Sequence, residues 1–284
     1  MLDLKNAGLT ELLNDFCTLT DMKLCIFDTD YQECASPPIK LYPFCARMRK
    51  IEEFDSRCRS CDEAHMQICR RSRKPLQYQC HAGLTEYLAP LYYEGVIVAF
   101  VCIGQATYGM DAEFDKIAQY AAQFGICKEE CHELYDMQIH YAPRTIQAAC
   151  RILDACISHI YHQRMLEVRS LDTAQQIEKY INDNIAWDLS IEHLCAHFSV
   201  SRAELYQLFH TSFNSSVADY IRSKRISMAE QMIRSTAMQI SEIASNVGFY
   251  DYNYFSKVFH RKFGCSPREY RKKLESGSEA ADKK

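Results

Sequence analysis

Two segments near the C-terminal end of the 284-residue chain carry the same pattern of apolar residues. The first begins at Ile191 and the second at Ile240, so the copies are offset by 49 residues before a central turn and by 50 after it. Each copy predicts a short amphipathic helix, a tight turn and a second helix with one apolar face. Two such units in tandem are typical of a repeated helix-turn-helix, which reaches adjacent turns of DNA.

Capping residues mark the expected helix boundaries in both copies. Ser190 is a suitable N-cap for the first helix, and Ser201 with Glu204 forms a capping-box pattern before the second helix. In the second copy, Gly248 is able to adopt the left-handed conformation that ends a helix, and Asp251 is placed to cap the helix that follows. The pattern therefore predicts both turns as well as the helices.

The outward positions of the two second helices carry side chains that suit base edges and phosphates. In the first copy they are Arg202, Ala203, Tyr206, Gln207 and His210. In the second copy they are Tyr252, Asn253, Ser256, Lys257 and Arg261. Cations that are candidates for phosphate neutralisation are Arg222, Lys224, Arg225, Arg261, Lys262 and Arg268.

The overall composition constrains how such a chain would contact DNA. Apolar residues make up 48% of the sequence and charged residues 25%, as in an ordinary folded protein, and the length favours two domains. The net charge is −4, and residues 171–274 hold 13 Lys and Arg against 11 Asp and Glu. Contacts to DNA must therefore come from local placement of cations and not from bulk charge.

The C-terminal segment resembles the AraC/XylS transcription regulators over roughly residues 172–274. The resemblance rests on Gly248-Phe249, on Phe259 followed by Phe263-Gly264, and on Ser266-Pro267 with Tyr270-Arg271. It implies that the two second helices enter successive major grooves, and that RNA polymerase is a partner. Ala203 and Tyr206 depart from the larger polar side chains that often occupy these positions in the family. The polar stretch 275–284 is expected to be a disordered tail.

The N-terminal half predicts an antiparallel sheet with flanking helices. Expected helices span 4–20, 111–124 and 129–140; expected strands span 23–28, 76–81, 86–92 and 96–105, with a hairpin turn at 93–95. Residues 31–75 carry four prolines and predict loop with short helices. A long helix follows over 143–169. Its residues Ile146, Leu153 and Ile160 are seven apart, which fits either a homodimer seam or packing on its own domain.

The cysteines of this half invite a metal interpretation. Cys58 and Cys61 form a C-x2-C pair, and Cys45 and Cys80 flank it, so four thiolates are available for zinc or an iron–sulfur cluster. The alternatives are thiols that are redox-active or simply buried. An enzyme using Cys80 and His81 is disfavoured, because neighbouring residues on a strand point to opposite faces.

The same half also resembles the PocR sensory domain, a PAS-like fold. The resemblance covers about residues 3–165 and rests on the segment Cys80–Leu84 and on Gly104-Gln105. It implies a pocket for a small organic effector, proposed for the family to be a simple hydrocarbon derivative such as a short diol. Candidate pocket residues on the strands and their ends are Phe27, Tyr78, His81, Tyr87, Phe100 and Gln105.

Together these features predict an α+β PAS-like sensory domain (1–165, with 143–169 as a connecting and possible dimerising helix) before an all-α tandem helix-turn-helix domain (172–274). The expected function is transcription regulation by a ligand-sensing DNA-binding protein, with no enzymatic activity. The alternative is a redox- or metal-responsive regulator that uses Cys45, Cys58, Cys61 and Cys80. No leader and no apolar run of membrane-spanning length is present, so a cytoplasmic location is expected.

Overall fold

A computed structural model of the chain describes residues 2–3, 7–35, 41–108, 110–168 and 171–281. The chain divides into two compact units, Met1–Asp172 and Thr173–Lys284, which we call the N-terminal and C-terminal units. Each unit has its own hydrophobic core and is described separately.

The N-terminal unit is built on a five-stranded antiparallel sheet with the strand order β3-β2-β6-β5-β4. Its strands are β2 (Lys23–Phe27), β3 (Glu33–Ala35), β4 (Leu76–Gln79), β5 (Thr85–Tyr93) and β6 (Val96–Ala106). A separate short pair joins β1 (Leu2–Asp3) to β7 (Glu167–Val168). The helices are α1 (Ala7–Thr20), α2 (Pro43–Met48), α3 (Glu52–Ser72), α4 (Asp111–Ala122), α5 (Lys128–Asp136) and α6 (Pro143–His162).

The hairpin between β5 and β6 has the turn that the sequence predicts. Its two loop residues, Glu94 and Gly95, both have positive φ, at 48° and 79°. This is the conformation of the two-residue turns whose twist matches the flanking strands. The hairpin brings Thr85 opposite Ala106, with a register shift between Thr85 and Tyr87.

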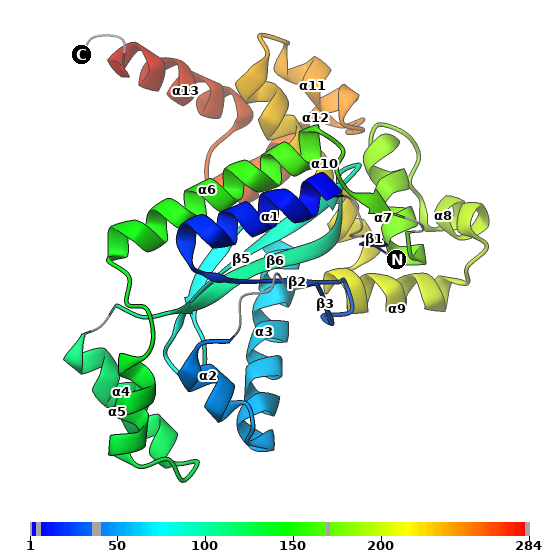
Figure 1. Cartoon of the computed structure of the whole chain (residues 1–284). Helices are drawn as coiled ribbons and strands as arrows, with labels where there is room; N and C mark the ends of the chain where they lie inside the picture. The colour runs from blue at the N-terminus through cyan, green and yellow to red at the C-terminus, as the bar shows by residue number, and fades with distance from the viewer. Residues whose placement is uncertain (1, 4–6, 36–40, 109, 169–170, 282–284) are drawn as a thin grey trace. The chain divides into compact units, whose positions relative to one another are not determined.

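Helices cover both faces of the sheet (Figure 1). On one face α1 and α6 lie side by side, and their apolar residues pack against Leu24, Ile26 and Val101 of the central strands. On the other face Met66 and Cys69 of α3 pack against β5 and β6. The unit is therefore an antiparallel sheet with flanking helices, and the predicted α+β class is confirmed.

Two predictions of local structure in this unit were wrong. Residues 52–72 form one helix of 21 residues, not loop with short helices. The prolines lie outside this range, and Glu52, Glu53 and Asp55 in its first turn suit the helix dipole. The connecting helix ends at His162 and not near 169, because Arg164 adopts a left-handed conformation with φ of 51°.

The apolar stripe of α6 packs inside its own unit. Ile146, Ala149, Leu153 and Ile160 are all buried in the core that α6 shares with α1 and the sheet. Of the two interpretations of the seven-residue spacing, the structure thus favours packing on the same domain, because a residue buried there is not available to a partner helix.

The C-terminal unit consists of helices throughout its described residues. They are α7 (Thr173–Asp183), α8 (Ile191–Phe198), α9 (Arg202–Phe213), α10 (Val217–Ser235), α11 (Ile240–Asn246), α12 (Tyr252–Phe263) and α13 (Pro267–Ala281). The stretch from residue 275 to Ala281, expected to be disordered, continues α13, and residues 282–284 lie outside the described part of the chain. None of the helices described in either unit combines the length and apolar character needed to cross a lipid bilayer.

Each helix-turn-helix copy has its own apolar core. Leu194, Leu205 and Phe209 are buried in the core of the first copy, and Ile243, Phe255 and Phe259 in the core of the second. The helix α10 contributes to both, through Ile221 to the first core and Ile233 to the second. At about 1.5 Å per residue, its 19 residues span about 28 Å between the copies.

Candidate functional site

The capping residues fix the start of each helix that is expected to read DNA. The Ser201 hydroxyl accepts a hydrogen bond from the Glu204 N–H, and the Glu204 carboxylate accepts one from the Ser201 N–H. The Asp251 carboxylate accepts from the N–H groups of Asn253 and Tyr254. Gly248 has a φ of +85°, as predicted for the turn before α12.

The expected reading faces of α9 and α12 are largely open to solvent. Arg202, Ala203, Tyr206, Gln207 and His210 are all exposed on α9, where Arg202 also forms an ion pair with Glu192 of α8. On α12, Asn253, Lys257 and Arg261 are exposed, whereas Tyr252 and Ser256 are half-buried. These positions remain predicted DNA contacts, and their exposure leaves them accessible to a duplex.

Three of the cations expected to contact phosphate have partners on other segments of the unit, and for Lys262 the partner is the Ser227 hydroxyl, which accepts at 2.8 Å. The Lys224 ammonium and the Glu178 carboxylate form a largely buried ion pair at 3.0 Å. The same carboxylate accepts a hydrogen bond from the Tyr220 hydroxyl. The Arg225 guanidinium donates to the carbonyl oxygens of Ile185 and Trp187 at 3.0 and 2.9 Å. The sequence pattern missed these roles, because the acceptors lie about 40 residues away along the chain.

The position of the Arg225 side chain also requires a glycine at position 248. A Cβ atom added to Gly248 would lie 2.8 Å from the guanidinium carbon of Arg225, so the side chain packs flat on the turn of the second copy. Arg225 therefore links the segment before α8 to the turn before α12, and burial lowers its pKa.

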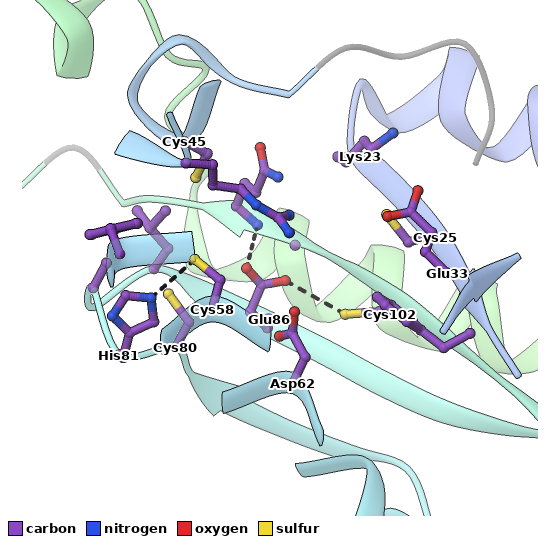
Figure 2. Close-up of a pocket in the computed structure, with 17 residues that line it drawn as sticks. Lys23, Cys25, Glu33, Cys45, Cys58, Asp62, Cys80, His81, Glu86 and Cys102 are labelled. Carbon is purple, nitrogen blue, oxygen red and sulfur yellow. Dashed lines mark hydrogen bonds between the residues drawn. The ribbon is translucent and has the colours of Figure 1, made fainter. Parts of the chain in front are cut away.

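In the N-terminal unit, a cavity lies between the sheet and the helices α2 and α3 (Figure 2). Strands β2, β5 and β6 supply one wall, α2 and α3 another, and the segment 80–84 closes an end. The lining residues are Lys23, Cys25, Phe27, Glu33, Cys45, Arg49, Phe54, Cys58, Asp62, Cys80, His81, Ala82, Leu84, Glu86, Cys102, Gly104 and Gln105. Its volume is about 60 Å³.

Glu86, a half-buried acid on β5, lines this cavity. Its Oε1 accepts a hydrogen bond from the Gln105 backbone N–H at 3.1 Å, and its Oε2 lies 3.6 Å from the Cys102 sulfur. A Cβ atom at position 104 would lie 1.4 Å from Glu86 Oε2, so Gly104 provides the space that the carboxyl group occupies. Gln105 follows with a φ of 60°, and its side-chain oxygen accepts from the Tyr42 N–H at 2.9 Å.

Burial in the cavity favours the neutral forms of the Glu86 and Asp62 carboxyl groups. Burial raises the pKa of Glu86 to about 8, and the nearby charge of Asp62 adds to the effect. Burial also raises the pKa of Asp62 to about 6, although Arg49 opposes it. Near neutral pH Glu86 is thus largely a carboxylic acid, which both donates and accepts hydrogen bonds.

The cavity brings together three of the four cysteines predicted to hold a metal. Cys45, Cys58 and Cys80 line it, whereas the Cys61 sulfur lies 3.7 Å from His65 Nδ1. Asp62, four residues after Cys58, occupies the cavity-facing position on α3. Among the described residues, no group of three or more Cys, His, Asp or Glu is arranged to hold a metal ion.

The thiols lack the features of an activated cysteine. Burial raises the pKa of Cys58 to about 12, and it raises those of Cys45 and Cys80 as well. His81 Nε2 lies 3.1 Å from the Cys58 sulfur, and its Nδ1 lies 3.0 Å from the Tyr120 hydroxyl. Burial lowers the pKa of His81, so this imidazole does not supply the positive charge that would stabilise a thiolate.

The expected pocket residues fall into two groups. Phe27, His81 and Gln105 line the cavity, whereas Tyr78, Tyr87 and Phe100 are not among its lining residues. Tyr87 follows Glu86 on β5, so it faces the opposite side of the sheet, where it packs in the core beneath α6. Phe100 and Tyr78 pack instead with Met66 and Cys69 of α3.

Glu86 and Asp62 were not predicted from the sequence; with Glu33 they are the three acids that line the cavity. The sequence does mark Glu86, because it is the one charged residue of the otherwise apolar strand Thr85–Tyr93. Gly104, inside the apolar strand β6, was a second signal, since a glycine in a strand often marks a close approach. Asp62 gave none, because it lies in a polar helix that was expected to be loop.

Comparison with known proteins agrees with this division of the chain. Residues 3–165 match the family described as the sensory domain found in PocR. Residues 194–273 match a helix-turn-helix domain family. The first match covers more than half of the chain, and the second includes α9 and α12.

Individual relatives show the same pattern. The regulatory protein PocR of Salmonella typhimurium is 25% identical over 97% of this chain and 96% of its own length. The transcriptional activator RhaR of Cronobacter sakazakii is 33% identical, over 35% of each protein. The arabinose operon regulatory protein of Escherichia coli is 36% identical, over 33% of this chain and 32% of its own length.

Several solved structures resemble part of the chain. The C-terminal domain of the response regulator yesN from Fusobacterium nucleatum is 26% identical over 36% of this chain and 99% of its own, with a TM-score of 0.34. From the two family matches, the chain belongs to the AraC-type DNA-binding transcription regulators that carry a PocR sensory domain.

Proposed function

We propose that the N-terminal unit binds a small, uncharged organic effector in the cavity around Glu86, and that binding changes the occupancy of DNA by the C-terminal unit. The observation that carries the proposal is Glu86 itself, a half-buried acid that lines a cavity, where Gly104 leaves room for its carboxyl group and Gln105 has a positive φ. Placing a carboxyl group in such a position costs free energy, and ionisable groups with strongly shifted pKa values cluster at functional sites.

The chemistry of the cavity supports an alcohol or short diol as the effector class. A neutral Glu86 exchanges hydrogen bonds with a hydroxyl group, while Phe27, Phe54 and Leu84 offer apolar contact to a short carbon chain. A volume of about 60 Å³ lies far below the roughly 300 Å³ of drug-sized sites, which favours a molecule of few atoms. A carboxylate effector would lose its hydration in a cavity where burial already disfavours the charged form of Glu86, so we expect it to bind less well than a neutral alcohol.

Two hydrogen-bonded links join the cavity to α6, the helix that precedes the C-terminal unit in sequence. Across the sheet, Tyr87 follows Glu86 and donates from its hydroxyl to Asp154 of α6 at 2.6 Å. In the second link, the Gln105 side-chain oxygen accepts a hydrogen bond from the Tyr42 backbone N–H. The Tyr42 hydroxyl in turn lies 2.5 Å from the hydroxyl of Tyr141, which comes just before α6. An effector that moves Glu86 or Gln105 would therefore act on both the start and the middle of α6.

A thermal-shift screen tests the effector proposal. The full-length protein is heated with a panel of short diols, alcohols and the matching carboxylic acids, beside a Glu86→Gln variant. We expect a diol or alcohol to raise the melting temperature of the wild type, the acids to have no effect, and the variant to respond weakly. A response to acids alone would contradict the proposal, because an effector stabilises only the state that it binds.

A metal-responsive regulator is the alternative proposal. Its support is the shared position of Cys45, Cys58 and Cys80 around one cavity, next to His81; zinc or an iron–sulfur cluster is the class of group that such thiols bind. Elemental analysis and visible absorbance of anaerobically purified protein decide between the two. Stoichiometric metal that is lost in a Cys58→Ser variant would replace the effector proposal with this one.

Homodimer formation and contact with RNA polymerase are further proposals from the family resemblance. Because the apolar stripe of α6 is buried in its own unit, a homodimer would use another surface. Light scattering of the full-length protein measures the oligomeric state directly. Recruitment of polymerase to a bound promoter tests the second partner.

A further inference from the structure

A cleft lies between the two helix-turn-helix copies of the C-terminal unit. It is lined by the segment 187–190 before α8, by one side of α10 including Ile221 and Arg222, and by the segment 248–251 with Tyr254 at the start of α12. Its volume is about 590 Å³. Aromatic side chains at its rim are open to solvent: Trp187 is 72% exposed and Tyr250 is 89% exposed.

The cleft opens beside the parts of the unit that approach DNA. In a helix-turn-helix, the N-terminal residues of the second helix contact base edges, and the first helix crosses the backbone. The cleft is bordered by the N-terminal ends of α8, a first helix, and of α12, a second helix. On one side of a duplex, two successive major grooves are separated by the minor groove and its two phosphate strands.

The side chains of the cleft match the backbone of a duplex. The Tyr250 and Tyr254 hydroxyls and the Trp187 indole N–H are groups that can donate hydrogen bonds to phosphate oxygens, and their rings have flat apolar faces that can contact deoxyribose. Arg222 adds a cation on α10. The carboxylates of the two acids that line the cleft accept hydrogen bonds from backbone N–H groups. Asp188 accepts from Ser190, and Asp251 accepts from Asn253.

We propose that this cleft binds the sugar–phosphate backbone of DNA between the two major grooves that α9 and α12 enter. Trp187, Tyr250, Tyr254 and Arg222 make the contacts. Arg225 lies beneath them and positions the two rims, because it bonds to the Trp187 carbonyl and packs on Gly248. The contacts carry no sequence information, so they strengthen binding to all duplexes alike.

Trp187 is the single tryptophan of the chain, which makes its fluorescence a direct probe of the cleft. The duplex is one selected from a random library by the full-length protein, and saturation is followed by the anisotropy of a label on the DNA. We expect the duplex to cover Trp187, which is 72% exposed in the free protein, and so to lower its acrylamide quenching constant. In the control, Trp187→Phe with Leu19→Trp places an exposed tryptophan in the N-terminal unit, and its quenching should not change.

Substitutions give a second, independent measurement. Arg222→Ala should lower the slope of log affinity against log salt by about 1, the effect of one lost phosphate contact. Arg222 forms an ion pair with Asp219 on α10, at 2.8 Å. Lys179→Ala is the matched control, because it removes a comparable ion pair, that with Asp183 on α7. Tyr250→Ala should weaken binding to the selected and to an unrelated duplex by the same factor, about tenfold.

Full quenching of Trp187 on saturating DNA, together with an unchanged salt slope for Arg222→Ala, would overturn the proposal. If Tyr250→Ala leaves DNA affinity intact but abolishes transcription from a bound promoter, the cleft is a protein-binding surface and the proposal is likewise wrong. Circular dichroism of each variant separates a lost contact from a lost fold.

Discussion

Removing the Arg225 side chain should destabilise the C-terminal unit, because the guanidinium bonds to the protein backbone and not to phosphate. The guanidinium makes two hydrogen bonds to backbone carbonyls, and hydrogen bonds to charged groups contribute about 1.5–3 kcal/mol each. The bond to Trp187 is exposed to solvent, where water competes with it, so it contributes only about 0.5–1 kcal/mol. Arg225→Ala should therefore lower the free energy of unfolding by about 2–4 kcal/mol.

Urea denaturation measures this loss, because Trp187 lies beside Arg225 and reports unfolding of the C-terminal unit. With a urea dependence of about 2 kcal/mol per molar, in the middle of the usual range, the midpoint should fall by about 1–2 M. Arg261→Ala is the control: Arg261 is exposed on α12, so its loss should leave the midpoint unchanged and reduce the salt dependence of DNA binding.

The opposite pattern would refute the reasoning. If Arg225→Ala unfolds at the same urea concentration as the wild type but shows a salt slope reduced by about 1, Arg225 contacts a phosphate in the complex. The internal role deduced from its bonds to Ile185 and Trp187 would then be wrong.

Three further predictions concern single side chains. Lys257→Ala should cost about 1–3 kcal/mol of DNA binding and relax the preference at one base, which anisotropy with base-substituted duplexes checks; an equal loss on all duplexes would indicate a phosphate contact. Glu86 has a pKa of about 8 in the folded protein against an ordinary 4.5, so the folded state retains a proton that the unfolded chain loses. Stability should fall by up to about 1.4 kcal/mol per pH unit between about pH 5 and 8, and urea unfolding followed by circular dichroism should show no such fall for Glu86→Gln. Cys58 should react with iodoacetamide much more slowly than the exposed Cys127, as measured by mass spectrometry of digested protein; rapid labelling of Cys58 would reveal an activated thiol.

The sequence was most informative where local patterns determine structure. The capping residues Ser201 and Asp251 and the turn at Gly248 act within a few residues of themselves, and all three were predicted. The strands of the hairpin and its Glu94–Gly95 turn followed from the same kind of local signal. The division into an α+β unit and a helical unit could be derived from these elements alone.

Contacts between distant segments could not be predicted in this way. Arg225 was expected to face phosphate, yet its acceptors belong to a loop about 40 residues earlier. Cys61 was expected beside Cys58, yet the unpredicted helix α3 gives the next cavity-facing position to Asp62. Tyr87 was expected in the pocket, but the position next to it on the strand, Glu86, is the one that faces inward.

The central claim is that the cavity around Glu86 controls DNA binding by the C-terminal unit. The most direct test is the affinity of the full-length protein for its selected duplex, measured with and without the diols and alcohols of the panel, for the wild type and for Glu86→Gln. The account predicts that at least one compound changes wild-type affinity by a factor between about 5 and 150, and that the substitution abolishes the change. An affinity that no compound alters, or an equal change in Glu86→Gln, would contradict it.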